Sequence, residues 1–280
     1  MTLWNGIELP EAYYKDDTAY FICGDSRSVL PLIPQSSIAS VITSPPYYAG
    51  MDYEDKHKSP DGYKQYLELI ISILSATQDI LLPGGHLWVN IDDVHTSLKS
   101  VYKKNIVLPT HAHLIATLSS TFEYKEIVLW RKVRGKHASG GSHRMLGSYG
   151  RFGSPGSIPV VQEVEYVLWF KKSGNRVIPD WLRKASSLSS DQFKEWGMQI
   201  WDISAERKRN GHPAPFPISL PDRIIRLSSF VGDTVLDPFA GSGTTAIAAQ
   251  QSGRKCISIE LSEQYCEDAV IRYLRSLNDH

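Results

Sequence analysis

The stretch that most constrains the fold is VLDPFAGSGTT, from Val235 to Thr245. An apolar run ends on Asp237, two glycines flank a serine, and a helical pattern begins at Thr244. Glycines at such a turn let a ligand approach the backbone, and the first N–H groups of the following helix point toward it. This order predicts an α/β sheet with a ligand site at the end of the strand.

Strand-like and helix-like segments alternate along the 280 residues, a length that suits one large α/β domain or a domain with an insert. The expected strands are 20–23, 38–42, 86–91, 126–130, 165–170, 234–236 and 255–259, and the expected helices are 61–82, 111–118, 244–251 and 263–277. This alternation predicts a doubly wound, mostly parallel sheet covered on both faces. The segment 173–210 is expected to be polar and irregular.

Composition excludes little by itself. Basic and acidic residues balance at 30 each, so net charge does not indicate a nucleic-acid protein. The segment 131–176 differs, because it holds nine basic and two acidic residues. The three cysteines lack metal-ligand spacing and suit a reducing compartment, and the longest apolar stretch, 67–82, is interrupted by charges like an amphipathic helix.

An acidic residue follows the next expected strand. Glu260 lies seventeen residues after Gly243, where a carboxylate is placed to accept two ribose hydroxyls. No lysine follows the glycines, so the loop is not a phosphate-binding P-loop. The pattern favours an adenosine ligand with a cationic tail over a purely structural turn.

A second motif, TSPPY, occupies Thr43–Tyr47 at the end of the strand 38–42. A hydroxyl and a carbonyl here can accept hydrogen bonds from an exocyclic amine, while the prolines fix the backbone. The tyrosine ring can receive an extruded base. The alternative is a proline turn with a tyrosine in the core.

Together, TSPPY and DPFAGSGTT (237–245) resemble the amino-directed DNA methyltransferases that use S-adenosylmethionine. The base motif precedes the cofactor motif, as in the permuted β group of that family. Four shorter matches support the resemblance, namely GDS (24–26), PGGHLWVNI (83–91), HPAPFP (212–217) and IELS (259–262). The resemblance implies a seven-stranded, Rossmann-like methyltransferase sheet with an antiparallel hairpin at its edge and a small target-recognition insert.

The motifs and the resemblance together predict the site residues. Catalysis is assigned to Ser44, Pro45, Pro46 and Tyr47. Cofactor contacts are assigned to Asp25, Thr43, Phe216, Asp237, Pro238, Phe239, Ala240, Gly241, Ser242, Gly243, Thr244, Thr245, Glu260 and Leu261. For Asp25 an Asx turn is an equal alternative, and for Phe239 core packing is a rival interpretation. No metal is expected, and Asp92-Asp93 is interpreted as a loop.

The residue at position 44 bears on the target base. Family members with aspartate there mostly methylate adenine N6, and those with serine mostly methylate cytosine N4. The resemblance therefore implies a cytosine-N4 enzyme, with adenine N6 as the alternative. A DNA-binding protein that has lost activity is a different class, and the intact motifs speak against it. No Pro-Cys pair is present for covalent C5 methylation.

The remaining predictions concern DNA and organisation. The catalytic domain is expected to comprise 1–172 and 202–280, with 173–201 as the target-recognition insert and 134–159 as a DNA-contacting loop. DNA contacts are predicted at Arg134, Lys136, Arg144, Arg151, Arg176 and Arg183. The expected partners are double-stranded DNA and, in the same restriction-modification system, an endonuclease on a separate chain. A prokaryotic cytosol fits this role.

Overall fold

A nine-stranded sheet forms the centre of the molecule in the computed structural model, which describes residues 1–48, 62–95, 106–133, 163–204 and 216–278. Its strands are, in spatial order, β11 (Ile200–Ser204), β9 (Glu123–Val133), β10 (Val164–Lys171), β6 (Leu81–Ile91), β5 (Ile38–Thr43), β12 (Thr234–Asp237), β13 (Lys255–Glu260), β4 (Ala19–Cys23) and β3 (Tyr14–Lys15). β6, β5, β12, β13 and β4 run parallel to one another. The predicted α/β class and mostly parallel sheet are confirmed.

The edges of the sheet differ from the prediction. β10 is antiparallel to both β6 and β9, as expected for the two similar runs. This pair is not the edge, however, because β11 adds a parallel strand outside β9. At the other end β3 pairs antiparallel with β4. The prediction of seven strands is therefore wrong by these two short edge strands.

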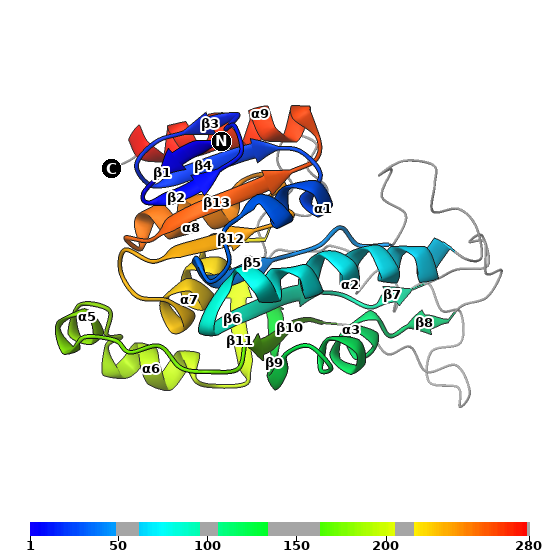
Figure 1. The fold of residues 1–280 in the computed structure, drawn as a ribbon. Helices are drawn as coiled ribbons and strands as arrows, with labels where there is room; N and C mark the ends of the chain where they lie inside the picture. The colour runs from blue at the N-terminus through cyan, green and yellow to red at the C-terminus, as the bar shows by residue number, and fades with distance from the viewer. Residues whose placement is uncertain (49–61, 96–105, 134–162, 205–215, 279–280) are drawn as a thin grey trace.

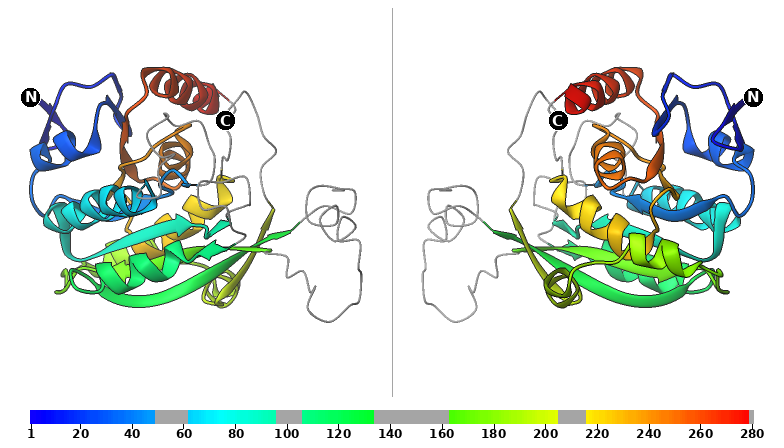
Figure 2. Two further views of the ribbon diagram at one scale, coloured as in Figure 1. Left: turned by 90° about the vertical axis from the view of Figure 1, so that its right-hand side faces the viewer. Right: turned by 90° about the vertical axis from the view of Figure 1, so that its left-hand side faces the viewer.

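Helices cover both faces of the sheet, so the molecule has three layers (Figures 1 and 2). One face carries α1 (Ser26–Val29), η1 (Leu30–Leu32), α2 (Gly62–Ile80) and α3 (Thr110–Leu118), and the other carries α7 (Ser219–Ser228), α8 (Thr244–Gln251) and α9 (Glu263–Asn278). Alternate strand residues enter opposite cores: Tyr20 and Ile22 belong to the core on the α2 face, and Phe21 belongs to the other, where its ring contacts Tyr273 of α9. Burial on both faces explains why these strands are continuously apolar.

The expected helix 61–82 ends at Ile80 because Leu81 already pairs with Ile38 in the sheet. The Pro83-Gly84-Gly85 run therefore lies inside β6 and not between two elements. Gly85 has a packing reason there, since a Cβ would stand 2.9 Å from the carbonyl oxygen of Leu82.

Residues 173–204, the described part of the segment 173–210, are more ordered than predicted. It contains α5 (Asp180–Ala185), α6 (Ser190–Trp196) and β11. The short hairpins of β1 (Thr2–Trp4) with β2 (Ile7–Leu9), and of β7 (Val94–His95) with β8 (Val107–Leu108), were also not predicted. Among the described residues, no helix is long and apolar enough to cross a membrane.

Candidate active site

The two motifs meet at the carboxyl edge of the parallel strands. Thr43 ends β5 and Asp237 ends the neighbouring β12. Glu260 ends β13, where it pairs with Cys23 at the end of β4. Ligands of open α/β sheets bind at this edge. The predicted base motif and cofactor motif are thus adjacent, although they are almost two hundred residues apart in sequence.

Asp237 joins these strand ends from within the core. Its carboxylate accepts hydrogen bonds from Thr43 Oγ1 (2.7 Å), Thr245 Oγ1 (2.6 Å) and the Phe239 amide (3.0 Å). It is fully buried, and burial raises the pKa of its carboxyl group to about 6 although the threonine hydrogen bonds oppose the rise. The side chains of Thr43, Asp237 and Thr245 are thus buried and join the two strand ends to the glycine loop, and their assignment as cofactor contacts stays a prediction.

The glycine loop has the backbone that the sequence predicts. Gly241 and Gly243 adopt positive φ angles of 51° and 73°, and Gly243 is the N-cap of α8. A Cβ on Gly243 would lie 3.1 Å from the Cβ of Ala269. Only glycine therefore satisfies both the left-handed backbone and the close approach of α9.

A cation at this loop was missed in the sequence. Arg272, on α9, donates to Thr244 Oγ1 (2.6 Å) and to the Ser242 carbonyl (3.1 Å). By contrast Arg254, the nearest basic residue in sequence, is buried and bonds the carbonyls of Ser252 and Ser229. Among the described residues, it is the packing of α9 over the loop that brings this cation to it.

Glu260 is half-buried beside the loop. One carboxylate oxygen accepts from the Gly241 amide (2.8 Å) and the other from the Ser262 amide (2.9 Å). Leu261, the next residue, is 69% exposed. Each carboxylate oxygen keeps a second lone pair, so a diol can still be bound at this position.

The other predicted cofactor residues have mixed placements. Asp25 caps α1 by accepting from the Arg27 amide, and it also pairs with the Arg27 guanidinium at 2.5 Å, so the Asx-turn alternative is what the structure shows. Pro238 accepts from Ser26 Oγ through its carbonyl (2.5 Å). The Ala240 amide donates to Ile259, which pins the loop to β13. Phe216 and Phe239 are half-buried against the two cores.

The base motif is tied to neighbouring strands through side chains. Tyr47 Oη donates to Glu165 Oε2 of β10 at 2.8 Å and accepts from Asn90 Nδ2 of β6 at 2.9 Å. Ser44 Oγ lies 3.5 Å from Tyr47 Oη and 3.4 Å from Asn90 Nδ2. Pro45 is buried, and Pro46 is half-buried. The motif is therefore a fixed turn that presents Ser44 and one side of the tyrosine ring.

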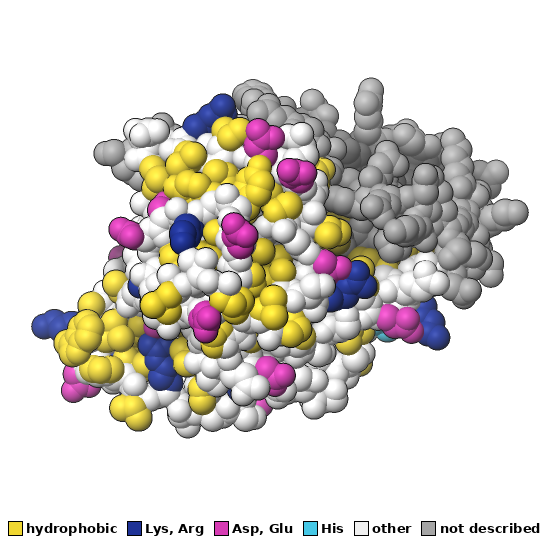
Figure 3. Space-filling model, turned by 45° about the horizontal axis from the view of Figure 1, so that its top comes forward, with side chains coloured by type: hydrophobic (Ala, Val, Ile, Leu, Met, Phe, Trp, Pro, Cys, Tyr) yellow, Lys and Arg dark blue, Asp and Glu magenta, His cyan; other side chains and the backbone are white. Residues whose placement is uncertain are grey.

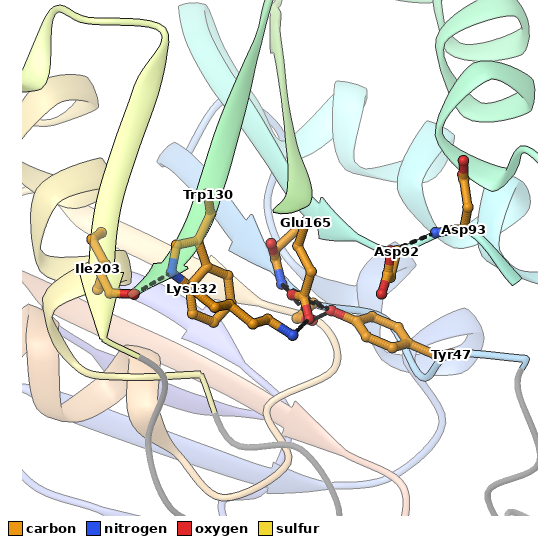
Figure 4. A network of polar contacts seen from close by, with 9 residues as sticks. Tyr47, Asp92, Asp93, Trp130, Lys132, Glu165 and Ile203 are labelled. Carbon is orange, nitrogen blue, oxygen red and sulfur yellow. Dashed lines mark hydrogen bonds and ion pairs between the residues drawn. The ribbon is translucent and has the colours of Figure 1, made fainter. Parts of the chain in front are cut away.

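Glu165 and Lys132 complete this network (Figure 4). The side chain of Glu165 is only 6% exposed, and it forms an ion pair with Lys132 of β9. The pKa of Tyr47 is raised well above its usual value, first by burial and then by the charge of Glu165. Sequence reasoning missed Asn90 and Glu165. The available signal was a polar residue inside an otherwise apolar strand, which needs a buried partner.

The predicted DNA contacts divide into two groups. Arg134, Lys136, Arg144 and Arg151 lie outside the described residues, but the segment that contains them joins Val133 to Val164 at the carboxyl edge. Arg176 instead pairs with Asp233 (2.6 Å), which precedes β12 at the opposite edge. Arg183 donates to the carbonyl of Ile178 (3.3 Å).

The predicted target-recognition insert, 173–201, also lies at the amino edge, away from the motifs (Figure 1). Ser186, after α5, accepts from the amide of Val231 ahead of β12, and Gly174 lies against Pro83 and Gly84 of β6. Its last two residues, Ile200 and Trp201, already belong to β11 of the central sheet. The residue after α5 thus bonds near the start of β12, and α6 is tied to α7 by the ion pair of Glu195 with Arg223 at 2.7 Å. Base reading by this segment stays a prediction.

Helices α5 and α6 expose apolar side chains, as the lower left of Figure 3 shows. Val177 is 95% exposed, Trp181 70% and Phe193 68%. The segment is thus less polar on its surface than its composition suggests.

The carboxyl edge fits S-adenosylmethionine. A left-handed glycine turn gives backbone access, the first amides of α8 face the site, and Glu260 offers lone pairs for ribose hydroxyls. When bound, the cofactor supplies an electrophilic methyl group on sulfur. The described residues contain no group of three or more His, Cys, Asp or Glu side chains that could hold a metal.

Comparisons with known proteins agree with this geometry. Residues 38–271 match the family model described as DNA methylase, with N6 and N4 in its name. The Type II methyltransferase M.BglI of Bacillus subtilis is 30% identical over 87% of this chain and 82% of its own.

Two solved structures share the fold. A Thermus thermophilus protein described as a DNA modification methylase, in complex with S-adenosyl-L-methionine, is 31% identical with a TM-score of 0.74, over 93% of this chain and 95% of that one. The PvuII DNA methyltransferase (cytosine-N4-specific) has a TM-score of 0.68 at 22% identity, over 96% of each chain. The chain belongs to the DNA methylase family and is an S-adenosylmethionine-dependent amino-DNA methyltransferase.

Proposed function

We propose that the protein methylates cytosine N4 in duplex DNA at one short sequence, as the modification enzyme of a type II restriction-modification system. The observation that supports this most is Ser44, which follows the last residue of β5 and lies between Asn90 and Tyr47 beside the glycine loop. A serine at this position goes with cytosine in most of the family that the sequence resembles. Adenine N6 is the product that would contradict the proposal.

The reaction needs an oriented amine. The amine lone pair of cytosine is delocalised into the ring, so the enzyme must hold the N–H groups so that the lone pair faces the methyl group. In the proposed mechanism Ser44 Oγ and the carbonyl of Pro45 accept those N–H groups. When bound, S-adenosylmethionine would supply the methyl group as an electrophile on sulfur, and the extra amine proton would leave to solvent.

The target base must first leave the helix, because its amine is not accessible to in-line attack within the stack. Tyr47 is half-buried, with its hydroxyl held by Asn90 and Glu165. We assign the accessible side of its ring as the receiving surface for the base. The segment 134–159, attached at the same edge of the sheet, is the proposed contact for the DNA backbone.

The proposal is tested in a host that lacks DNA methylation. A plasmid expressing the wild-type protein is sequenced by a method that detects modified bases, with the Ser44→Ala variant as the comparison. We expect one short sequence to be modified throughout the wild-type plasmid, and modification to fall by roughly a hundredfold or more in Ser44→Ala. Unchanged modification by Ser44→Ala would remove this residue from the mechanism.

A further inference from the structure

Glu165 is a buried carboxylate that takes no part in the proposed methyl transfer. It lies on β10, next to β6, and its side chain reaches the hydroxyl of Tyr47 beyond the end of β5 (Figure 4). Burying a carboxylate is unfavourable unless hydrogen bonds and an opposite charge compensate for the lost water. Here Tyr47, Asn90 and Lys132 supply both. Such a compensated charge at the base motif suggests a role in that motif.

The hydrogen positions around Glu165 follow from simple counting. An ionised carboxylate only accepts, so the single hydroxyl hydrogen of Tyr47 points to Glu165 Oε2, 2.8 Å away. The raised pKa of Tyr47 keeps that hydrogen in place. One lone pair of Tyr47 Oη accepts from Asn90 Nδ2 at 2.9 Å. The other lone pair is left to accept from Ser44 Oγ, which lies 3.5 Å away as a donor.

The consequence concerns Ser44. A serine hydroxyl has one hydrogen and two lone pairs. If its hydrogen points to Tyr47, both lone pairs remain available, apart from the long contact of 3.4 Å with Asn90 Nδ2. A lone pair is what an amine N–H of the target base requires. If the hydrogen bond between the two hydroxyls were reversed, so that Tyr47 donated to Ser44, the hydrogen of Ser44 would point at the base.

We propose that Glu165 is a positioning residue that orients the hydroxyl hydrogens of Tyr47 and Ser44, so that Ser44 Oγ accepts from the target amine. Lys132 supports this role by pairing with the second carboxylate oxygen. Asn90 holds the same oxygen of Glu165 as Tyr47 does, at 2.8 Å, and thereby fixes the carboxylate toward the motif. The inference rests on the proposed role of Ser44.

The test uses single-turnover methyl transfer at saturating DNA and S-adenosylmethionine. Glu165→Gln keeps the shape but adds an N–H group, and Tyr47→Phe keeps the ring but removes the hydroxyl. We expect each to lower the transfer rate by roughly 10- to 100-fold, because a displaced acceptor misaligns the amine. Binding of the cofactor and of DNA is expected to remain unchanged, which a general structural defect would not allow.

The double variant shows whether Glu165 and Tyr47 act through one hydrogen-bond network or contribute independently to the transfer rate. If Glu165 acts through Tyr47, Glu165→Gln with Tyr47→Phe should lose no more than the larger single loss. Multiplied losses would overturn the proposal, as would wild-type rates in both single variants. The matched controls are Glu126→Gln and Tyr124→Phe, both on β9 toward the other edge of the sheet, and both are expected to transfer at the wild-type rate.

Failure of the proposed function can be distinguished from failure of the inference about Glu165. Wild-type transfer by Ser44→Ala would contradict the role of Ser44, whereas a loss in Ser44→Ala with normal rates in Glu165→Gln and Tyr47→Phe would contradict only the role of Glu165. If thermal melting shows that Glu165→Gln does not fold, the Tyr47→Phe variant is the deciding test. A normal transfer rate in Tyr47→Phe would overturn the positioning role of Glu165. A lower rate with unchanged binding of cofactor and DNA would support it.

Discussion

Single residues explain how two distant motifs become one site. Asp237 illustrates this best, because its two carboxylate oxygens connect the end of β5, the start of α8 and the loop between β12 and α8. The sequence indicates that an acid ends this strand. It does not indicate that the acid is buried, because that depends on where Thr43 and Thr245 lie in three dimensions.

The pKa of Asp237 predicts a pH dependence. Since its folded-state pKa of about 6 lies above the ordinary value of 3.8, folding favours the protonated form. The contribution of Asp237 to the free energy of unfolding is fully present below its ordinary pKa of 3.8. This contribution is lost as the pH rises through about 6. Asp237→Asn cannot ionise and should lack this loss.

The measurement is chemical denaturation of both proteins across that range. We expect the free energy of unfolding of the wild type, relative to Asp237→Asn, to fall by about 2 kcal/mol between about pH 4 and pH 7. Parallel profiles would show that the carboxyl group titrates normally.

Helices and strands are predicted well where the hydrophobic periodicity and the residues that begin or end an element agree. The strand, glycine turn and helix around 235–251 and the closing helix on 263–277 match β12, α8 and α9 closely. Prediction failed where pairing across the sheet decides the outcome. Leu81 leaves the helical pattern to pair in β6, and Ile200–Ser204 becomes a strand because β9 offers an open edge.

Partners within the sheet limit what could be predicted of the site. The motif residues were identifiable, since each lies at a strand end with characteristic neighbours. Asn90 and Glu165 were not, because they face Tyr47 only through the register of β10 on β6, which places Tyr166 opposite Ile91. Arg272 likewise reaches the loop only through packing of α9.

Gly243 gives a prediction at the level of an element. Gly243→Ala places a Cβ at a φ of +73° and 3.1 Å from the Cβ of Ala269. We expect the free energy of unfolding to fall by about 1–2 kcal/mol from the left-handed backbone and crowding, and cofactor binding to weaken. Calorimetric titration with S-adenosylmethionine and thermal melting measure the two effects.

Gly232 is the matched control. Its φ is +83°, but nothing lies within 4 Å of an added Cβ, and it precedes β12 at the opposite edge. Gly232→Ala should lose stability by about 1 kcal/mol and bind the cofactor normally. Equal weakening of cofactor binding in both variants would remove the glycine loop from the binding site.

His86 links two strands and predicts the opposite pH behaviour. Trp169 Nε1 donates to His86 Nδ1 at 3.0 Å, which requires an unprotonated ring nitrogen. Burial, assisted by nearby lysines, lowers the pKa of His86 to about 4, below the ordinary 6.5. The stabilising contact is present above pH 6.5 and is lost as pH falls through about 4.

Titration by NMR should therefore show His86 neutral until about pH 4. The Trp169→Phe variant removes the indole donor and is the comparison. A His86 midpoint near the ordinary value in the wild type would contradict the buried contact.

In the whole molecule, the central sheet keeps the groups at the carboxyl ends of its parallel strands apart from those at the amino ends. The carboxyl edge holds the base motif, the glycine loop and the attachment points of 134–162. The amino edge holds α5 and α6, together with Arg176 and its partner Asp233. Sequence order alone placed 173–201 where a target-recognition region is expected, but the topology returns this segment to the starts of the strands.

This arrangement predicts which arginines matter for DNA. Arg183→Ala, at the amino edge, should leave methylation rate and sequence preference unchanged. Arg144→Ala with Arg151→Ala should weaken binding to all duplexes and flatten its salt dependence, because each lost phosphate contact removes counterion release. Filter binding across a salt series measures both. A changed recognition sequence in Arg183→Ala would return base reading to the insert.

The atom that the enzyme methylates is identified by nucleoside analysis of modified DNA. Plasmid DNA modified by the wild-type protein in a methylation-free host is digested to nucleosides and analysed by mass spectrometry against N4-methyldeoxycytidine and N6-methyldeoxyadenosine standards, with Ser44→Ala plasmid as the control. We expect N4-methyldeoxycytidine as the main modified nucleoside and its loss in the control. N6-methyldeoxyadenosine as the main product would contradict the cytosine assignment.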